Sequence, residues 1–402
     1  MTMLYAIVGL GVLIFVHELG HFLVSLSLGM RPRRFYIGFP PAIVSVKRRG
    51  IEYGIGAIPL GGFVKIPGMH RPAGSDVEAA FGLVREEAPP LAPMIDGLRN
   101  VVDDGDEQSA LERMATLERE IADRPLSAAA RRLALKGIDD LRDALGPDAY
   151  WRAATWKRVA AIAAGPLANI VLALVLFTGL YMTSAGKATS LVDRVDEKTP
   201  AAAIGLEHGD RIVAINGARV TADEIASTIA ASRGRMLVVT VVRGGSELVL
   251  PAARPELEDG RYRLGFALTG KGLGPVAAVG ESFRLTGRVA RDIGASLGRL
   301  VHGEGRKDIS SPVGIVQGSS AAAKQGADDF FFVLGLISLS IALLNLLPLL
   351  PLDGGHIVFA VAEGLRGRSV RREIYERVSI VGIGLVVLLF FIGLSNDLTG
   401  PS

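Results

Sequence analysis

The most prominent pattern in this chain is a series of long apolar segments separated by polar and charged stretches. The first covers residues 3–28, the second 159–182, the third begins at 330, and the last covers 378–394. A helix needs about 20 apolar residues to cross the hydrocarbon core of a bilayer. The pattern therefore predicts a multi-pass α-helical membrane protein with four transmembrane helices.

The third apolar segment is too long to be one straight span. Residues 330–365 as a single helix would be roughly 54 Å long, well beyond the thickness of a bilayer. We therefore expect a break within the membrane, with Asp353 inside it. Irregular backbone at this depth is tolerated where it lines a cavity or a site. The residues that mark the break are Pro348, Pro351, Gly354 and Gly355.

Basic residues set the expected orientation of these spans. They gather at residues 31–34, 152–158 and 366–372, which four spans bring to one side of the membrane. The positive-inside rule makes that side the cytoplasm. We therefore expect residues 31–157 and 366–376 in the cytoplasm, and both termini outside.

Two cytoplasmic segments follow the first span. Residues 35–66 are alternating and glycine-rich, with a hairpin turn at 47–50. Either this hairpin dips into the bilayer edge and holds an extended substrate by strand addition, or it is a small sheet without substrate contact. The next segment, 70–148, is charged, and we expect a partly flexible insertion with helices near 110–122 and 128–145.

Composition narrows the class of protein. The chain is 49% hydrophobic and 21% charged, with a mean hydropathy of +0.37. These values favour charged domains joined to membrane spans, in contact with lipid and without a nucleic-acid partner. There are no cysteines, so any metal ligands must come from histidine, aspartate or glutamate. The net charge of +3 decides little.

The candidate chemistry lies in the first span, as His-Glu-Leu-Gly-His. His17 and His21 are one helical turn apart on one face, where two ring nitrogens can bind one Zn²⁺. Glu18 is placed to take a proton from the water that the metal activates. Polar groups inside a span are costly, and a metal compensates for them. The alternative is a chance occurrence in a soluble helix.

The third ligand is expected from the broken segment. Asp353 is an intramembrane carboxylate beside irregular backbone, and it would leave the fourth position of a tetrahedral zinc for water. His356 is a rival ligand, although a local hydrogen bond is the simpler expectation for it. In the second span, Gly165-Pro166 precedes Asn169, which either accompanies a helix kink or has a role in the site.

An extracytoplasmic α+β domain is expected over residues 188–270. The run T-P-A-A-A-I-G-L-E-H-G-D-R-I-V-A-I-N-G at 199–217 resembles the PDZ signature of bacterial membrane and periplasmic proteases. Such domains resemble peptide binders that add a strand at a groove, although the groove could instead serve only as a size filter. A helix near 223–232 and strands at 236–243 and 246–251 should follow. The expected groove residues are Gly205, Leu206, Gly209 and Asp210.

An amphipathic segment follows this domain. Residues 280–300 alternate apolar side chains with arginines, so this helix either lies on the outer membrane surface or packs on the PDZ domain. A loop is expected at 311–315.

Taken together, these motifs resemble the site-2 protease family of intramembrane zinc metalloproteases. The resemblance combines His-Glu-Leu-Gly-His, Gly-Pro-Leu-Ala-Asn, one PDZ unit and the Asn-Leu-Leu-Pro-Leu-Leu-Pro-Leu-Asp-Gly-Gly run at 345–355. It implies that His17, His21 and Asp353 bind one zinc ion and that Glu18 is the catalytic base. It also implies substrate contacts from a second group: Asn345, Gly61, Gly62, Phe63 and Asn169.

The resemblance further implies a function within the bacterial regulated-proteolysis branch of the family. The enzyme would sit in the inner membrane and cleave within the spanning segment of single-pass proteins, such as an anti-sigma factor or a remnant signal peptide. An upstream site-1 protease would act first. Two other functions remain open, a catalytically inactive PDZ adaptor and a metal transporter.

The expected organisation is as follows: first transmembrane helix, 1–30; β-loop, 31–69; charged insertion, 70–150; second transmembrane helix, 151–184; PDZ domain, 188–270; amphipathic helix and loop, 275–328; third, broken transmembrane segment, 329–366; fourth transmembrane helix, 374–398.

Overall fold

The computed structural model describes residues 2–183, 186–258, 261–302, 311–368, 370 and 372–399. The chain divides into two compact units. The first consists of Met1–Leu172, Ala290–Gln325 and Leu336–Ser402, and the second of Ala173–Val289 and Gly326–Gly335.

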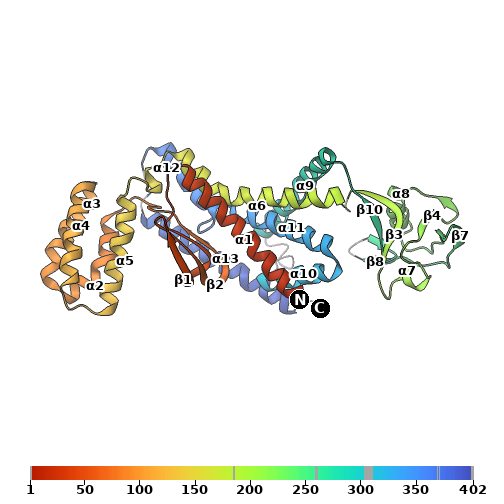
Figure 1. Ribbon diagram of the computed structural model, residues 1–402, viewed down its shortest axis with the longest axis horizontal. Helices are drawn as coiled ribbons and strands as arrows, with labels where there is room; N and C mark the ends of the chain where they lie inside the picture. The colour runs from red at the N-terminus through yellow and green to blue at the C-terminus, as the bar shows by residue number, and fades with distance from the viewer. Residues whose placement is uncertain are drawn as a thin grey trace. The chain divides into compact units, whose positions relative to one another are not determined.

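The first unit contains most of the helices (Figure 1). Its elements, in chain order, are α1 (Thr2–Ser27), β1 (Arg34–Arg48), β2 (Ile51–Lys65), α2 (Gly74–Glu87), a 3₁₀ turn (Pro89–Leu91), α3 (Ala92–Asp104), α4 (Glu107–Ala122), α5 (Ala128–Leu145), a second 3₁₀ turn (Tyr150–Arg152), the first part of α6 (Thr155–Thr183), the end of α9 (Pro275–Val301), α10 (Pro312–Gln325), the end of α11 (Ala327–Asn345), α12 (Asp353–Arg366) and α13 (Arg372–Thr399).

Four helices within the described residues are long and apolar enough to cross a membrane, as the sequence predicts. They are Thr2–Ser27, Thr155–Thr183, Ala327–Asn345 and Ile374–Leu398. The third apolar segment is broken: α11 ends at Asn345, and α12 begins at Asp353 after a short irregular stretch. Gly354 is required there, because a Cβ on it would stand 2.3 Å from the carbonyl oxygens of Leu346 and Leu347.

Strands β1 and β2 form an antiparallel hairpin beside α1 (Figure 1). Arg49 and Gly50 make the turn with positive φ angles of 50° and 83°, which suits a tight two-residue connection. The end of β2 returns to the start of β1, so that Tyr36 lies opposite Phe63 and Ile37 opposite Gly62.

The hairpin has a charged end and an apolar end. The register sets Arg34 opposite both Glu52 and Lys65, and Lys47 opposite Glu52. Each of these four residues lies three positions along its strand from an apolar residue or a glycine. Together, these four form a second row across the sheet: Ile37, Val44, Ile55 and Gly62. The strand segment 62–65 therefore runs from the apolar end of the sheet toward the charged end.

The insertion between the first two spans is a bundle of four helices, α2–α5 (Figure 1). Apolar residues at helical spacing meet in one core, including Phe81, Ile95, Leu117 and Ile138, each at most 1% exposed. Each such burial contributes about 1.5–3 kcal/mol before entropy is counted. Helices α2 and α5 cross closely, because a Cβ on Gly137 would stand 2.2 Å from the Cβ of Ala80.

This bundle departs from the partly flexible segment that the sequence predicts. Helices α4 and α5 lie where two helices are expected, but α2 and α3 were not foreseen. The Pro89-Pro90 pair belongs to the short turn between α2 and α3. Pro93 lies in the first turn of α3, where its missing N–H costs nothing.

The loop expected at 311–315 is wrong, because helix α10 begins at Pro312 and continues to Gln325. Helix α10 contacts α1 and α13. The Asp397 carboxylate of α13 accepts hydrogen bonds from the backbone N–H groups of Ser311 and Gly314, at 2.7 and 3.1 Å. These contacts satisfy donors that a helix start leaves free.

The second unit is rich in β-structure. Its elements are the end of α6, β3 (Lys187–Val195), α7 (Pro200–Ala203), β4 (Arg211–Ile215), β5 (Ala218–Arg219), α8 (Ala222–Ala231), β6 (Val239–Arg243), β7 (Ser246–Val249), β8 (Glu256–Glu258), β9 (Arg261–Arg263), β10 (Phe266–Lys271) and the starts of α9 and α11. The main sheet has the order β10-β3-β4-β6-β7, with β5 beside β4. Apolar residues of β3, β4, β6 and α8 share its core.

Candidate metal centre

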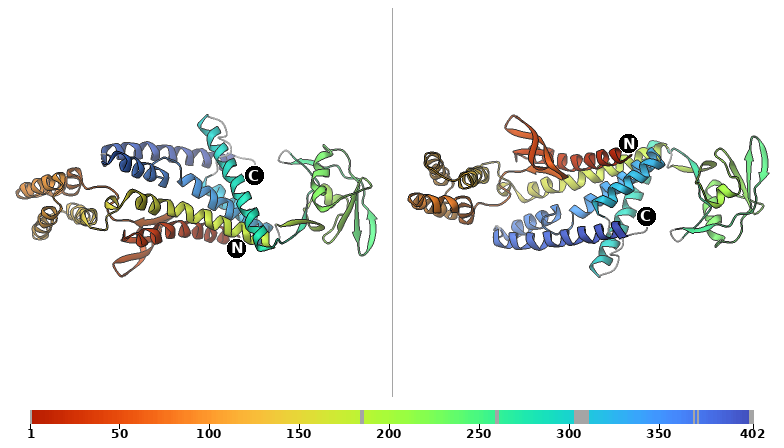
Figure 2. Two further views of the ribbon diagram at one scale, coloured as in Figure 1. Left: turned by 90° about the horizontal axis from the view of Figure 1, so that it is seen from above. Right: turned by 90° about the horizontal axis from the view of Figure 1, so that it is seen from below.

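Helix α1 carries two histidines on its buried face. Leu13, His17 and His21 follow one another at four-residue steps, and the two histidines are 8% and 7% exposed. Because i and i+4 residues lie one above the other on a helix, the rings are neighbours, with centroids 4.9 Å apart. This face of α1 lies against α6, and the two helices run side by side (Figure 2).

Close packing against α6 fixes the His21 ring. Its Nδ1 lies 3.0 Å from the carbonyl oxygen of Ala161. A carbonyl can only accept, so Nδ1 carries the proton and Nε2 keeps its lone pair. A Cβ on Gly165 would stand 2.2 Å from that Nε2, and a Cβ on Gly20 would stand 2.4 Å from the Ala164 carbonyl oxygen. Glycines at both positions therefore allow α6 to approach the ring.

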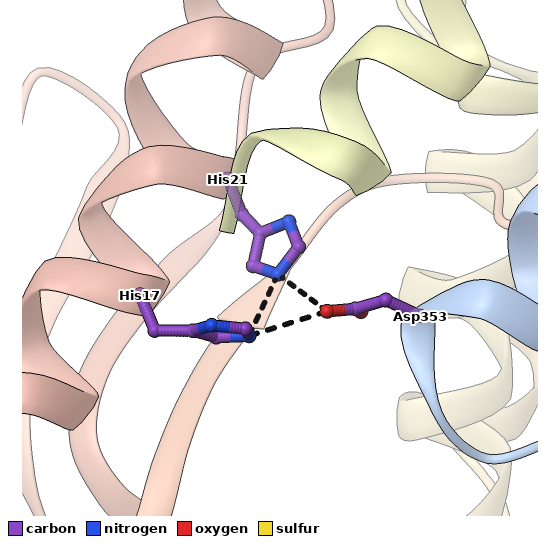
Figure 3. A group of neighbouring side chains, drawn as sticks. All are labelled: His17, His21 and Asp353. Carbon is purple, nitrogen blue, oxygen red and sulfur yellow. Dashed lines mark hydrogen bonds and ion pairs between the residues drawn. The ribbon is translucent and has the colours of Figure 1, made fainter. Parts of the chain in front are cut away.

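Asp353 reaches the same point from the other end of the chain. It is the first residue of α12, and its carboxylate points toward both imidazoles (Figure 3). Its Oδ2 lies 3.2 Å from His17 Nε2 and 3.3 Å from His21 Nε2, and the two Nε2 atoms are 3.3 Å apart. Three atoms that can each donate a lone pair thus form a nearly equilateral triangle.

The dimensions of this triangle fit a zinc ion. With metal–ligand bonds of about 2.0–2.1 Å and tetrahedral angles, zinc ligands stand about 3.3 Å from one another. Within the described residues, Asp353 Oδ2 accepts no hydrogen bond of good geometry, although it is buried. This is the only group of three or more histidine, cysteine or acidic side chains there whose ligand atoms gather this closely. A shared cation would satisfy all three atoms.

Glu18 directly follows His17 in the sequence, and its side chain lies against the hairpin. A Cβ on Gly62 would stand 2.1 Å from Glu18 Cγ and 2.9 Å from its Oε1. Of the other two hairpin residues named from the sequence, Gly61 lies against the Phe39 ring, and the Phe63 ring packs 6.2 Å from that of Tyr36. Gly62 is therefore the hairpin residue that meets the candidate base.

The remaining polar candidates in the spans do not join the group of His17, His21 and Asp353. The Asn345 amide donates to the carbonyl of Ile341 in its own helix, at 3.1 Å. His356 hydrogen-bonds with the hydroxyl of Tyr375, in agreement with a local role rather than metal binding. Asn169 is completely buried, and its side-chain amide has no partner among the described residues, while its backbone carbonyl accepts from Ser338.

The four residues expected to line a PDZ groove form a tight turn instead. Leu206 belongs to the core, and Asp210 is 1% exposed. Both oxygens of Asp210 accept hydrogen bonds from Arg243, at 2.7 Å, and the Gly205 carbonyl accepts a third. The Arg243 guanidinium lowers the pKa of Asp210. Gly209 has a φ of 87°, which glycine adopts without strain.

A cleft of about 580 Å³ lies elsewhere in the second unit. It is lined by α8, through residues such as Ile225 and Ile229, and by the chain from Arg261 to Leu268. Gly205, Leu206, Gly209 and Asp210 are not among its lining residues. The signature run therefore did not predict which surface of this unit is hollow.

Two contributors to the centre were missed from the sequence. The Ala161 carbonyl could not be found, because every residue carries one. Gly165 left a signal, since a Gly-Pro pair inside an apolar span is unusual, but neither of the two interpretations, a helix kink or a role in the site for Asn169, connected it with His21. Pro166 lies within the continuous helix α6.

Comparison with known proteins identifies the family. A model of peptidase family M50 matches residues 5–389. Zinc metalloprotease RasP of Geobacillus kaustophilus is 31% identical, over 98% of this chain and 96% of its own. Regulator of sigma-W protease RasP of Bacillus subtilis is 28% identical, over 99% and 98%. Zinc metalloprotease RasP of Bacillus licheniformis is 29% identical, over the same shares. The chain therefore belongs to peptidase family M50 and is a zinc metalloprotease of the site-2 type.

Proposed function

We propose that this protease hydrolyses a peptide bond within the membrane-spanning segment of single-pass proteins, with His17, His21 and Asp353 as zinc ligands and Glu18 as the general base. The observation that carries the proposal is the triangle of three ligand atoms at 3.2–3.3 Å, formed by α1 and α12 beside the hairpin. The three residues are at least four-fifths buried, in a chain with four apolar helices.

The chemistry divides between the metal and the chain. When bound, zinc supplies a Lewis acid that polarises a peptide carbonyl and acidifies water. Glu18 takes the proton from the attacking water and passes it to the leaving amine nitrogen. His21 keeps Nε2 available because its Nδ1–H donates to Ala161. This second contact orients the ring, as carbonyl partners of ligating histidines commonly do.

Substrate binding is proposed to use the end of β2. Residues 62–65 pair with 34–37, and no other described strand pairs with them. A helical substrate hides its backbone in its own hydrogen bonds, so it must unwind before hydrolysis, and an exposed strand edge can pair with the extended form. Asn345 and Asn169 are proposed as further backbone contacts. For Asn169, the support is a buried amide without a described partner.

The orientation follows from the basic residues. We assign residues 31–157 and 366–376 to the cytoplasm of a bacterial inner membrane, and both termini and the second unit to the outside. The domain limits are proposed as the sequence indicates them, with a membrane-associated hairpin at 31–69 and a cytoplasmic insertion at 70–150.

The β-rich second unit is proposed to be a PDZ domain. Its six-stranded main sheet with α8 agrees with a small α+β peptide-binding module. The cleft beside α8 is the better candidate for a peptide groove than the turn at 205–210. The domain would admit single-pass substrates that an upstream site-1 protease has already trimmed, and would exclude bulky outer domains.

The substrate class is inferred from the relatives. One similar protein is named a regulator of sigma-W protease. We therefore propose anti-sigma-factor-like proteins or remnant signal peptides as substrates of this chain. An inactive adaptor would not need an intact Glu18, and a metal transporter would need polar residues along several spans.

The decisive test replaces Glu18 with Gln in the full-length protein in lipid nanodiscs, with a single-span reporter. We expect cleavage to fall by at least 100-fold while zinc content stays near one per chain, because the amide cannot accept the proton. Leu23→Gln, an exposed position on the same helix, is the matched control for adding an amide. Cleavage that survives Glu18→Gln would contradict the assignment of the base, and a wild-type protein that leaves every such reporter intact would contradict intramembrane proteolysis.

A further inference from the structure

A cleft of about 490 Å³ separates the end of the hairpin from the insertion bundle. One wall is the chain from Phe63 to Ile66. The other wall is made by α2 and α5, including Ala79, Leu133 and Lys136. The cleft thus begins one residue after Gly62, which lies against Glu18. The cleft is therefore continuous with the edge of β2 that passes the candidate site.

The register of the hairpin gives this edge a direction. Gly62 belongs to the apolar row of the sheet, and Lys65 belongs to the row that contains Arg34, Lys47 and Glu52. Each residue advances a strand by about 3.3 Å, so Lys65 lies roughly 10 Å beyond Gly62. An extended peptide paired with residues 62–65 therefore leaves the apolar end of the sheet and passes into the cleft after three or four residues.

Ion pairs join the helix bundle to the hairpin beside this cleft. Lys65 Nζ lies 2.7 Å from Asp140 Oδ1 and 3.0 Å from Asp143 Oδ2. Arg33, just before β1, contacts Asp143 at 2.7 Å and Asp148 at 2.8 Å. These ion pairs hold α5 and the chain just after it against the charged end of the hairpin. The cleft is consequently a fixed part of the strand edge.

The charges of the cleft match one kind of peptide. The lining contains the carboxylates of Asp76, Asp140 and Asp143 and the ammonium groups of Lys65 and Lys136, while Arg33 neutralises Asp143 from outside the lining. Asp143 is 16% exposed and holds both Arg33 and Lys65, whereas the Asp140 side chain is 48% exposed. A carboxylate offers about four acceptor positions, so Asp140 can take a second cation. The cytoplasmic flank of a membrane span is rich in Lys and Arg.

We infer that the cleft between Phe63–Ile66 and helices α2 and α5 receives the cytoplasmic juxtamembrane residues of the substrate, and that Asp140 binds a basic residue there. The inference rests on the proposed intramembrane proteolysis and gives the insertion bundle a role in substrate selection. The bundle contacts substrate residues that lie outside the bilayer, several positions from the cleaved bond.

The first test is cross-linking in the full-length chain. Because the protein contains no cysteine, one introduced thiol is unique. In the Glu18→Gln background, which keeps the substrate whole, Lys136→Cys should form a disulfide with a cysteine placed three to six residues on the cytoplasmic side of the cleaved bond. Leu135→Cys, an exposed neighbour outside the cleft lining, is the control. Equal cross-linking of both variants, or none, would overturn the inference.

The second test measures charge preference. Reporters share one apolar span and carry either Lys-Arg or Glu-Glu in the cytoplasmic flank. The wild-type protein should show a two- to fivefold higher kcat/KM for the basic reporter, about the effect of one partly exposed ion pair. Asp140→Asn should remove that preference and leave the Glu-Glu reporter unchanged or slightly better. Asp139→Asn, 73% exposed and paired with Arg142 outside the cleft, should keep the preference.

The outcomes separate the two claims. If Glu18→Gln abolishes cleavage of both reporters but flank charge has no effect in the wild-type protein, the protease assignment stands and the inference fails. If the wild-type protein cleaves neither reporter, the proposed function fails, and the inference falls with it. Loss of preference in Asp139→Asn as well would assign the effect to the general charge of α5 and overturn the role of Asp140.

Discussion

Gly62 of the hairpin lies so close to Glu18 of α1 that a Cβ on the glycine would stand 2.1 Å from Glu18 Cγ. Two segments with different roles therefore meet without a side chain between them. The backbone that is proposed to hold the substrate and the carboxylate that is proposed to move the proton share one narrow space. A substrate strand paired with residues 62–65 would pass directly beside the base.

This contact predicts the effect of Gly62→Ala. The new methyl group must displace either Glu18 or the strand, so we expect cleavage of a single-span reporter to fall about 10- to 100-fold, as small misplacements of reacting groups commonly do. Zinc content should not change, because the ligands are untouched. Gly11→Ala in the same helix α1, where an added Cβ meets nothing within 4 Å, is the control for activity and folding. Wild-type activity in Gly62→Ala would refute the close contact.

Gly165→Ala should act on the metal rather than on the base. Its Cβ would stand 2.2 Å from His21 Nε2, the atom that faces His17 and Asp353. The ring must turn away and lose the Ala161 hydrogen bond. We therefore expect at least ~10-fold weaker zinc binding, because a ligating histidine that loses its second hydrogen bond is no longer held in its binding orientation. Competition with a chelator measures it. Gly179→Ala, on α6 but in open space, should bind zinc normally.

Asp353→Asn tests the third ligand. The amide keeps the size of the side chain but supplies no negative charge, so zinc retained after dialysis should drop well below one per chain. Activity should fall with it and return only partly at high zinc concentration. Asp329→Asn, an acidic residue at the start of α11, provides the comparison for removing a charge from this part of the chain. Full zinc occupancy in Asp353→Asn would remove this residue from the ligand set.

The second unit should show a pH dependence that comes from Asp210. Arg243 lowers the pKa of Asp210 in the folded state, below the value of about 3.9 in an unfolded chain. A lowered pKa contributes stability above the unfolded value, and that contribution is lost as pH falls through the folded pKa. Asp210→Asn should therefore destabilise the unit at pH 7 by about 1–2 kcal/mol, less than a fully buried pair would lose, because the Arg243 side chain is 33% exposed.

The measurement is hydrogen exchange of β4 and β6 in the full chain. The difference between Asp210→Asn and the wild type should be largest at neutral pH. It should shrink below about pH 4, where the Asp210 carboxylate of the unfolded chain begins to be protonated while that of the folded chain is still charged. Asp193→Asn, which removes another carboxylate from the same unit, is the matched control. A gap that stays constant from pH 7 to pH 3 would contradict the charge argument.

The sequence predicted the spans and the hairpin because both depend on local patterns. An apolar run of fixed length, or a basic turn between alternating strands, can be identified without knowing its neighbours. The gathering of His17, His21 and Asp353 was also expected, since polar groups in lipid need partners. Their role as ligands, and that of Glu18, stays a prediction.

Other features depend on distant residues and were missed. Helix α10 has glycines and serines that are typical of a loop, but α1 and α13 give it a packing surface, and Asp397 caps its first turn. Helices α2 and α3 form because they share a core with α4 and α5. The residues at 205–210 were expected from their letters to line a groove, whereas the position of the cleft depends on how α8 packs beside Tyr262–Phe266.

The ligand triangle draws two of its corners from the first helix of the chain and the third from the start of α12. During synthesis, the histidines enter the membrane well before the aspartate leaves the ribosome. A growing chain would thus be unable to complete its metal site before α12 has been made, and newly inserted spans nearby would be safe from it until then.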